Sequence, residues 1–342
     1  HLRTSLVGAT FMCIAATSAI WQGCQSSHST HMPSNFKYPT SRVEPVIDTL
    51  WETEVADPYR WLEDDRASET SEWVDAQNAL TRSHLDSIPL RAELRSRFEA
   101  LFNYEKIGVP RKMGGRYFIS KNDGLQNQSV WYVRETLNGT DALFLDPNLL
   151  SNDGTVTASL GSASEDERWL TVIQSSAGSD WQEIHLYDLN TGESTGEILN
   201  WVKFSGTSWS GNGFYYSRYP EPDGSEYSAE NTYHSVYYHQ IGTDQSADRL
   251  IFRNDEEPNR YHFAYATEDQ KFLVLSTSTG TDGNSIHVRS LEIENAPWVE
   301  VIGGFDTRSS LIDHTNGQFL VLTDQDAPKY RLIGIDSQKV DR

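Results

Sequence analysis

The sequence is poor in cysteine and in positive charge. Its two cysteines, Cys13 and Cys24, lie within the first 24 residues, so no disulfide, cysteine-ligated metal or thiol nucleophile is expected in the rest of the chain. Lysine and arginine number 28 against 49 acidic residues, which gives a net charge of −21. This balance disfavours nucleic acid as a partner, because phosphate backbones are bound by clustered basic side chains.

Motifs for catalysis or for cofactor binding are also missing. The segment from Gly206 to Ser210 comes closest to a G-x-S-x-G nucleophile turn, but it lacks the final glycine. No H-E-x-x-H, P-loop or G-x-G-x-x-G motif occurs. His234 and His239 flank a strand around Tyr237, and at that spacing they point to opposite faces. The sequence therefore predicts no metal site, no cofactor and no catalytic residue within this chain.

The first residues predict export. Arg3 precedes an apolar run over residues 6–21, which is too short and broken to span a membrane and is typical of a signal peptide. The stretch from Trp21 to Cys24 resembles a bacterial lipoprotein cleavage box, although Leu and Ala or Ser are expected where Trp21 and Gln22 stand. We expect a periplasmic protein or one anchored by a lipid on Cys24. The alternatives are an ordinary signal peptide, or a wrongly assigned start and a cytoplasmic protein.

Aromatic residues are abundant, and their pattern changes along the chain. Residues 68–85 predict a helix capped by Ser68 or Ser71, with a stripe of Trp73, Gln77, Leu80 and His84. A second helix is expected to have Pro89 in its first turn and to end near Leu101. Two helices this short form an arm rather than a domain, because they cannot bury a core alone.

After residue 104 the pattern alternates, and a polar turn followed by an aromatic strand recurs. Its occurrences are separated by 52, 45, 58 and 47 residues, counted from Arg116, Arg168, Gly213, Lys271 and Gln318. A repeat of about 50 residues with four strands is typical of β-propeller blades. A long β-sandwich is the competing interpretation, but it predicts turns every ~8–12 residues without that longer repeat. The fold class is therefore all-β, a β-propeller preceded by a short helical arm.

The fifth unit predicts strands near residues 309–313, 318–324 and 330–335, after which the sequence stops inside the array. We expect about four and a half blades. The flat faces of the first and fifth blades are expected to be exposed apolar surfaces that promote aggregation.

The run from Asp57 to Asp64, D-P-Y-R-W-L-E-D, resembles the entry sequence of the prolyl oligopeptidase family. Other stretches resemble that family in the same order and spacing: 122–128, 144–148, 151–155, 178–181, 202–205 and 237–246. The resemblance covers residues 36–335 and implies a bacterial serine endopeptidase that cuts short peptides after proline. It further implies about seven blades, an arm packed on an α/β-hydrolase domain, and a monomer when full-length.

In that family the Ser-Asp-His triad lies C-terminal to the propeller, so the resemblance implies that it falls beyond Arg342 and that this chain is inactive. It also implies that Phe204 lines the pocket for proline, the alternative being an aromatic residue of a strand core. Asp180 and Trp181 are expected to face the hydrolase domain. Ser278 and Thr281 stand where better-known members often have arginine and cysteine, which puts the substrate contacts of that loop in question.

We expect three regions: residues 1–35 as signal and tether, 36–103 as the arm, and 104–342 as the partial propeller. Two functions remain open at this point. The chain is either the non-catalytic front of a prolyl oligopeptidase or a stand-alone propeller that binds peptides or proteins. The arm favours the first, because the segment from Asp57 to Asp64 otherwise has nothing to pack on.

Overall fold

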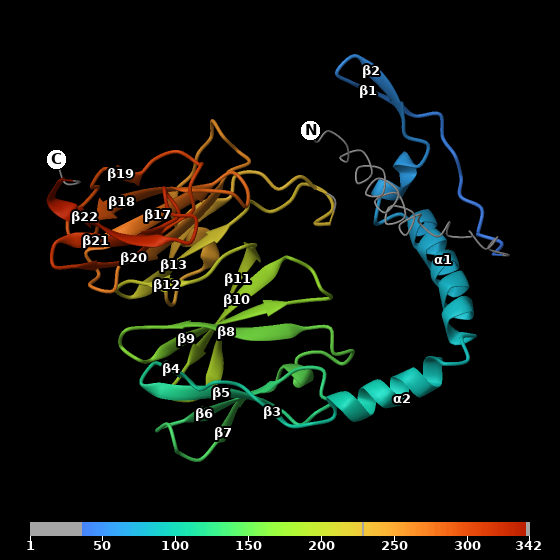
Figure 1. Cartoon of the computed structure of the whole chain (residues 1–342), viewed down its shortest axis with the longest axis horizontal. Coiled ribbons are helices and arrows are strands. Elements are labelled where there is room, and N and C mark those ends of the chain that lie inside the picture. The colour runs from blue at the N-terminus through green and yellow to red at the C-terminus, as the bar shows by residue number, and fades with distance from the viewer. Residues whose placement is uncertain (1–35, 228, 340–342) are drawn as a thin grey trace, which may run out of the picture.

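The computed structural model describes residues 36–227 and 229–339, so the expected signal segment and Cys24 lie outside the described residues. The described chain is a series of antiparallel sheets preceded by two helices (Figure 1). The sheets follow one another around an arc, and the helices extend away from the first sheet (Figure 1). The prediction of a partial β-propeller with a helical arm is confirmed.

The arm contains an extended segment, a hairpin of β1 (Ile47–Leu50) and β2 (Thr53–Ala56), and the helices α1 (Ser68–Asp86) and α2 (Arg91–Phe102). The extended segment before the hairpin covers the predicted stripe of α1. Trp73 Nε1 donates to Ser41 Oγ at 2.8 Å, and the Phe36 ring lies 4.6 Å from the His84 ring. Within the described ranges, no helix is long and apolar enough to cross a membrane.

Both predicted helix starts were wrong in detail. Ser68 is the first helical residue of α1, and Ala67 stands at the N-cap without a side-chain hydrogen bond. Pro89 precedes α2 and lies in a turn that Arg91 N closes by donating to Ile88 O at 3.0 Å. Proline fits the second position of such a turn because its ring fixes φ near the required value. Pro89 therefore belongs to the turn before α2 and not to the first turn of the helix.

The strands form five consecutive blades, of which the second and third share one continuous sheet because Val202 pairs with Arg218. Blade one contains β3 (Lys106–Ile107), β4 (Arg111–Met113), β5 (Arg116–Asn122), β6 (Val130–Arg134) and β7 (Ala142–Leu145). Blade two contains β8 (Thr157–Ala163), β9 (Trp169–Ser175), β10 (Gln182–Asp188) and β11 (Glu193–Val202). Blade three contains β12 (Ser208–Trp209), β13 (Gly213–Arg218), β14 (Ser235–Gln240) and β15 (Arg249–Phe252). Blade four contains β16 (Tyr261–Ala266), β17 (Phe272–Ser278), β18 (Ser285–Ser290) and β19 (Val299–Ile302).

The last sheet contains β20 (Ser309–Thr315), β21 (Gln318–Thr323) and β22 (Arg331–Asp336), close to the predicted strands. The core lies between the blades. Phe118 of blade one packs with Leu170 of blade two, Phe214 of blade three packs with Ile184 of blade two, and Phe319 packs with Phe272 across the last two sheets. The abundant aromatic residues therefore fill the contacts between blades.

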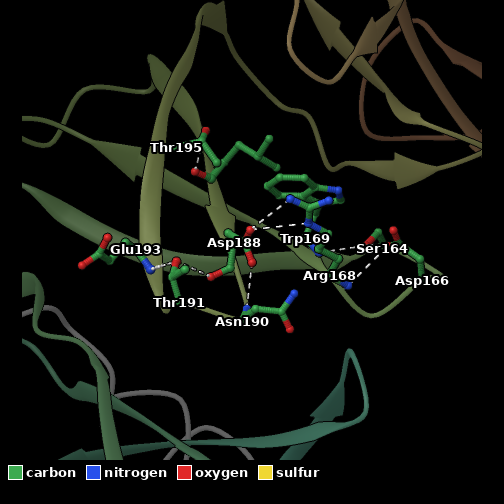
Figure 2. A network of polar contacts seen from close by, with 10 residues as sticks. Ser164, Asp166, Arg168, Trp169, Asp188, Asn190, Thr191, Glu193 and Thr195 are labelled. Atoms are coloured by element: carbon green, nitrogen blue, oxygen red, sulfur yellow. Dashed lines mark hydrogen bonds and ion pairs between the residues drawn. The ribbon is translucent and has the colours of Figure 1, made fainter.

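The recurring polar turn is a hydrogen-bonded structure at the start of the second strand of a blade. In blade two, Ser164 Oγ donates to Asp166 Oδ1 at 2.5 Å and accepts from Trp169 N at 2.9 Å. Figure 2 shows this turn beside Arg168, whose guanidinium lies 3.4 Å from Asp188 Oδ2 and stacks 4.2 Å from the Trp169 ring. The network joins the first turn of the blade to its last.

Blade four repeats the turn with threonine in place of serine. Thr267 Oγ1 donates to Asp269 Oδ1 at 2.7 Å and accepts from Phe272 N at 3.1 Å. Glu167 and Gln270 occupy equivalent positions in the two turns, and both have a φ of 58°. The repeat seen in the sequence therefore reflects a repeated backbone conformation.

Candidate functional site

Each blade has two ends with different connections. At one end lie the loops between the second and third strands, together with the segments that lead to the next blade; we call this the connection end. The long loop between β13 and β14 belongs to it and reaches toward the arm (Figure 1). Arg66 Nη2 donates to Gly224 O at 2.7 Å, and Ser225 Oγ donates to Asp65 Oδ2. The arm therefore contacts the propeller at its connection end.

Four residues of the connection end form a group that we call the Lys203 cluster: Asp180, Trp181, Lys203 and Phe204. Lys203 Nζ lies 4.0 Å from Asp180 Oδ2, 4.9 Å from the centre of the Trp181 ring and 5.8 Å from that of Phe204. The Lys203 side chain is 14% exposed, whereas that of Asp180 is 70% exposed. The cation is thus sheltered by aromatic faces, which attract it.

Trp181 is fixed by the loop that faces the arm. Its Nε1 donates to Glu226 O at 2.8 Å, and its ring meets those of Trp201 and Tyr219 edge-on at 5.6 and 6.1 Å. Beside it lies a cavity of about 210 Å³ with polar and aromatic walls, lined by residues that include Ser176, Trp181, Asn200, Trp201, Glu226 and Tyr227. Because pockets for drug-sized ligands begin at about 300 Å³, this space suits a single side chain.

Phe204 has an unusual backbone conformation. It lies in the connection between β11 and β12 with a φ of 52°, and its side chain is 49% exposed. A left-handed conformation costs a non-glycine residue about 1–2 kcal/mol and persists where the surroundings enforce it. The ring meets Tyr261 edge-on at 5.9 Å. In this structure Phe204 is therefore a half-exposed ring at the connection end, outside the strands.

His234 holds the backbone next to Phe204. Its Nε2 donates to Lys203 O at 3.0 Å, and its Nδ1 accepts from His262 N at 3.0 Å. A ring that both donates and accepts is neutral, since both nitrogens of an imidazolium donate. Burial lowers the pKa of His234 to about 4, in keeping with this tautomer. The imidazole thereby joins blades three and four to the segment that carries Phe204.

His239 lies at the opposite end of β14 and has different partners. Its Nδ1 lies 2.7 Å from Asp248 Oδ1, and its Nε2 lies 3.1 Å from Glu197 Oε2 on blade two. Burial alone lowers the pKa of His239, but the hydrogen bonds and charges of Asp248 and Glu197 outweigh it and raise the pKa. The two histidines are thus held separately. Among the residues that the structure describes, no group of histidine, cysteine or acidic residues is arranged to hold a metal ion.

One Ser-His-Asp arrangement does occur, away from the connection end. His314 Nε2 lies 3.1 Å from Ser337 Oγ, and His314 Nδ1 lies 2.8 Å from Asp269 Oδ2. Ser337 is buried, however, and its hydroxyl donates to Gly317 O at 2.9 Å. A nucleophile must be accessible and must give its proton to the base. We interpret this arrangement as a structural contact between two blades.

Comparisons with known proteins agree with the fold and add information on its family. Residues 38–342 match the family model described as "Prolyl oligopeptidase, N-terminal beta-propeller domain". The chain is 42% identical over 301 residues to a prolyl endopeptidase of Elizabethkingia meningoseptica, and this match covers 87% of the chain and 42% of that protein. It is 31% identical to prolyl oligopeptidase A of Amanita bisporigera, over 93% of the chain and 46% of that protein.

Solved structures agree as well. A prolyl endopeptidase structure superposes with a TM-score of 0.81 at 29% identity, covering 90% of this chain and 45% of that one. Prolyl oligopeptidase B from Galerina marginata, bound to a 35-residue hydrolysis and macrocyclization substrate, gives 0.77 at 26% identity over 89% and 47% of the two chains. The chain belongs to the prolyl oligopeptidase family. It spans slightly less than half the length of the relatives that it matches.

The residues that the sequence analysis selected lie together at the connection end of this prolyl oligopeptidase propeller. Asp180, Trp181 and Phe204 meet around Lys203, while Ser278 ends β17 and Thr281 lies in the following loop, also at the connection end. Their roles toward substrate and catalytic domain stay predictions. The sequence analysis missed Lys203 and His234. Lys203 could have been noticed, because it directly precedes Phe204 in the sequence. The hydrogen-bond partners of His234 lie 31 and 28 positions away from it, so no local pattern reveals them.

Proposed function

We propose that this chain is the N-terminal, non-catalytic part of a prolyl oligopeptidase. The full protein is a serine endopeptidase that hydrolyses short peptides on the C-terminal side of proline, and the propeller restricts substrate size. The observation that supports this most is that the relatives matched along both arm and blades are prolyl endopeptidases. The arm contacts and the Lys203 cluster both lie at the connection end of the blades, which further supports the proposal.

The surface of the arm supports a partner domain. In α2 no residue is buried, and more than half of each of several large apolar side chains is exposed: Leu94, Phe98, Leu101 and Phe102. An apolar surface of this kind marks an interaction site. We propose that the α/β-hydrolase domain of the full protein covers it, with residues 36–103 forming the arm and 104–342 belonging to the propeller.

The last sheet supports further blades. Its face toward blade four buries Leu311, Phe319 and Val321, whereas Leu332 on the other face and Ile312 at a bulge are each 57% exposed. A blade normally buries both faces against neighbours. We propose that the propeller of the full protein continues beyond this sheet and covers these side chains.

Activity is tested on two lengths of the protein. The 342-residue chain and a version extended through the hydrolase domain are assayed with a chromogenic peptide that has proline before the leaving group. We expect turnover from the extended form alone, abolished by a serine-directed phosphonylating inhibitor, with large folded proteins left intact. Inhibitor-sensitive turnover by the 342-residue chain that is lost in Ser337→Ala would make the buried Ser-His-Asp arrangement catalytic and contradict the proposal. An inactive extended form would favour a peptide- or protein-binding module instead.

We further propose export, with the mature protein beginning near Cys24. Mass spectrometry of the protein from a Gram-negative host identifies its N-terminus, and fractionation with a Cys24→Ser variant tests the lipid anchor. Retention of an intact N-terminus in the cytoplasm would contradict export. Membrane association that is unchanged in Cys24→Ser would contradict lipidation.

A further inference from the structure

The segment that connects blades two and three is held by a hydrogen bond on each side of Phe204. Before it, Lys203 O accepts the hydrogen bond from His234 Nε2 at 3.0 Å. After it, Ser205 Oγ accepts from Ser217 N at 2.8 Å. Phe204, with its left-handed φ of 52°, stands between these two fixed points. The direction of its ring therefore depends on both.

The hydrogen bonds of His234 also involve the neighbouring blade four. His262 N donates to His234 Nδ1 at 3.0 Å, and the next residue back along β16 is Tyr261, whose ring contacts Phe204. Ser217 Oγ in turn donates to His262 O at 2.8 Å. His234 and His262 are each 1% exposed, so water does not compete for these hydrogen bonds. Blade four thus holds Phe204 directly through Tyr261 and indirectly through His234.

We infer that His234 is a positioning residue that sets the Phe204 ring for the peptide substrate, acting through the Lys203 carbonyl. The inference rests on the proposed function, because that function supplies the peptide that the Phe204 ring would contact. His234 itself is buried and touches no substrate. Its effect is to keep a half-exposed ring in one orientation before the peptide arrives, which lowers the entropy lost on binding.

Two variants separate the hydrogen bonds of His234. His234→Gln keeps a donor at the position of Nε2 for Lys203 O, whereas His234→Asn keeps an acceptor at the position of Nδ1 for His262 N and loses the reach to Lys203. His185→Asn is the matched control, since His185 contacts Glu183 on blade two at 2.9 Å and takes no part in this network. All variants are made in the protein extended through the hydrolase domain.

The first readout does not depend on activity. 4-Fluorophenylalanine is placed at position 204, and its ¹⁹F resonance is recorded without substrate. We expect one sharp resonance in the wild type, in His185→Asn and in His234→Gln, and a shifted or broadened one in His234→Asn. An unchanged resonance in a folded His234→Asn protein would overturn the positioning role, whether or not the protein cleaves peptides.

The second readout is the KM for a short proline-containing peptide. We expect His234→Asn to raise KM about tenfold with little change in kcat, and His234→Gln to restore KM toward the wild-type value. In a Phe204→Ala background, His234→Asn is expected to have no further effect. A moved resonance with an unchanged KM would overturn the link to substrate. A wild-type protein without any turnover would refute the proposed function, while the ¹⁹F result would still decide whether His234 orients Phe204.

Discussion

The arm and the blades are built from similar residues but bury them very differently. Between residues 36 and 103 a single residue, Thr70, is buried, although this region carries many phenylalanine, leucine and tryptophan side chains. In the blades, each cluster of buried residues spans two blades and includes fully enclosed rings such as Phe118, Phe214 and Phe319. Apolar residues alone therefore do not make a core. The blades bury theirs against one another, whereas the arm presents its own to solvent within this chain.

The first prediction tests this contrast with matched residues. Phe214→Ala, in the cluster between blades two and three, is expected to lower the free energy of unfolding by about 3–5 kcal/mol, because it removes buried area and leaves a cavity. Phe98→Ala in α2 removes the same atoms from a side chain that is 56% exposed, so we expect a change below about 0.5 kcal/mol. Urea unfolding of the 342-residue chain measures both. Equal losses would mean that the arm has a core of its own.

The second prediction concerns the charged contact between blades two and three. Asp248 has a fully buried side chain that accepts from both His239 and Tyr216 OH, the latter at 2.6 Å. Asp248→Asn leaves the imidazolium of His239 without its nearest carboxylate, and we expect a loss of about 3 kcal/mol at pH 6. Exposed Glu257→Gln, which removes a carboxylate from a surface ion pair, is the control.

The same contact predicts that stability depends on pH above about 6.5. The pKa of His239 is raised in the folded state, so its stabilisation is complete below the unfolded-state pKa of about 6.5 and is lost as pH rises through the folded value. Asp248→Asn is expected to flatten this dependence. If the wild type and Asp248→Asn lose stability in parallel as the pH rises above about 6.5, His239 is not the group responsible.

The third prediction concerns acid. Burial lowers the pKa of both His234 and His262 to about 4, with the neighbouring His234 and Arg260 charges contributing for His262. A lowered histidine pKa means that the unfolded chain takes up protons first, so stability is lost as pH falls from about 6.5 toward 4. We expect these two histidines together to cost about 3–4 kcal/mol between pH 7 and pH 5, and His234→Gln to lose about half as much. Urea unfolding at the two pH values decides this. Identical losses in both proteins would exclude His234.

The sequence predicted the blades well because they repeat. The polar turns with Ser164 and Thr267 recur with their hydrogen bonds and backbone angles, and a repeated requirement leaves a repeated sequence. The stripe of α1 was also predictable, since it depends on residues three or four positions apart. The helix caps were not, because Ala67 carries no capping group that a sequence could reveal.

The candidate site was predictable only in part. The resemblance to prolyl oligopeptidases selected Phe204, Asp180 and Trp181, but their shared contact with Lys203 depends on how two loops fold against each other. The role of His234 was hidden for the same reason, because its partners come from other blades. A neutral buried histidine and a charged one also look alike in sequence, and surroundings alone distinguish His234 from His239.

The smallest effect is expected where the arm and the blades meet. Within the described residues, side-chain hydrogen bonds join Arg66 to Gly224 O and Ser225 to Asp65, and both partners on the blade side belong to one loop. Arg66→Ala removes a largely exposed contact, so we expect the free energy of unfolding to change by less than about 0.5 kcal/mol. The loop should nevertheless lose its attachment. We therefore expect faster backbone amide exchange in residues 221–227 of Arg66→Ala than of wild type, with exchange in β13 and β14 unchanged. Arg95→Ala, an α2 change at a position 70% exposed, is the control. If exchange in the loop is unaffected, the arm does not restrain the blades, and the two regions are more independent than their contacts indicate.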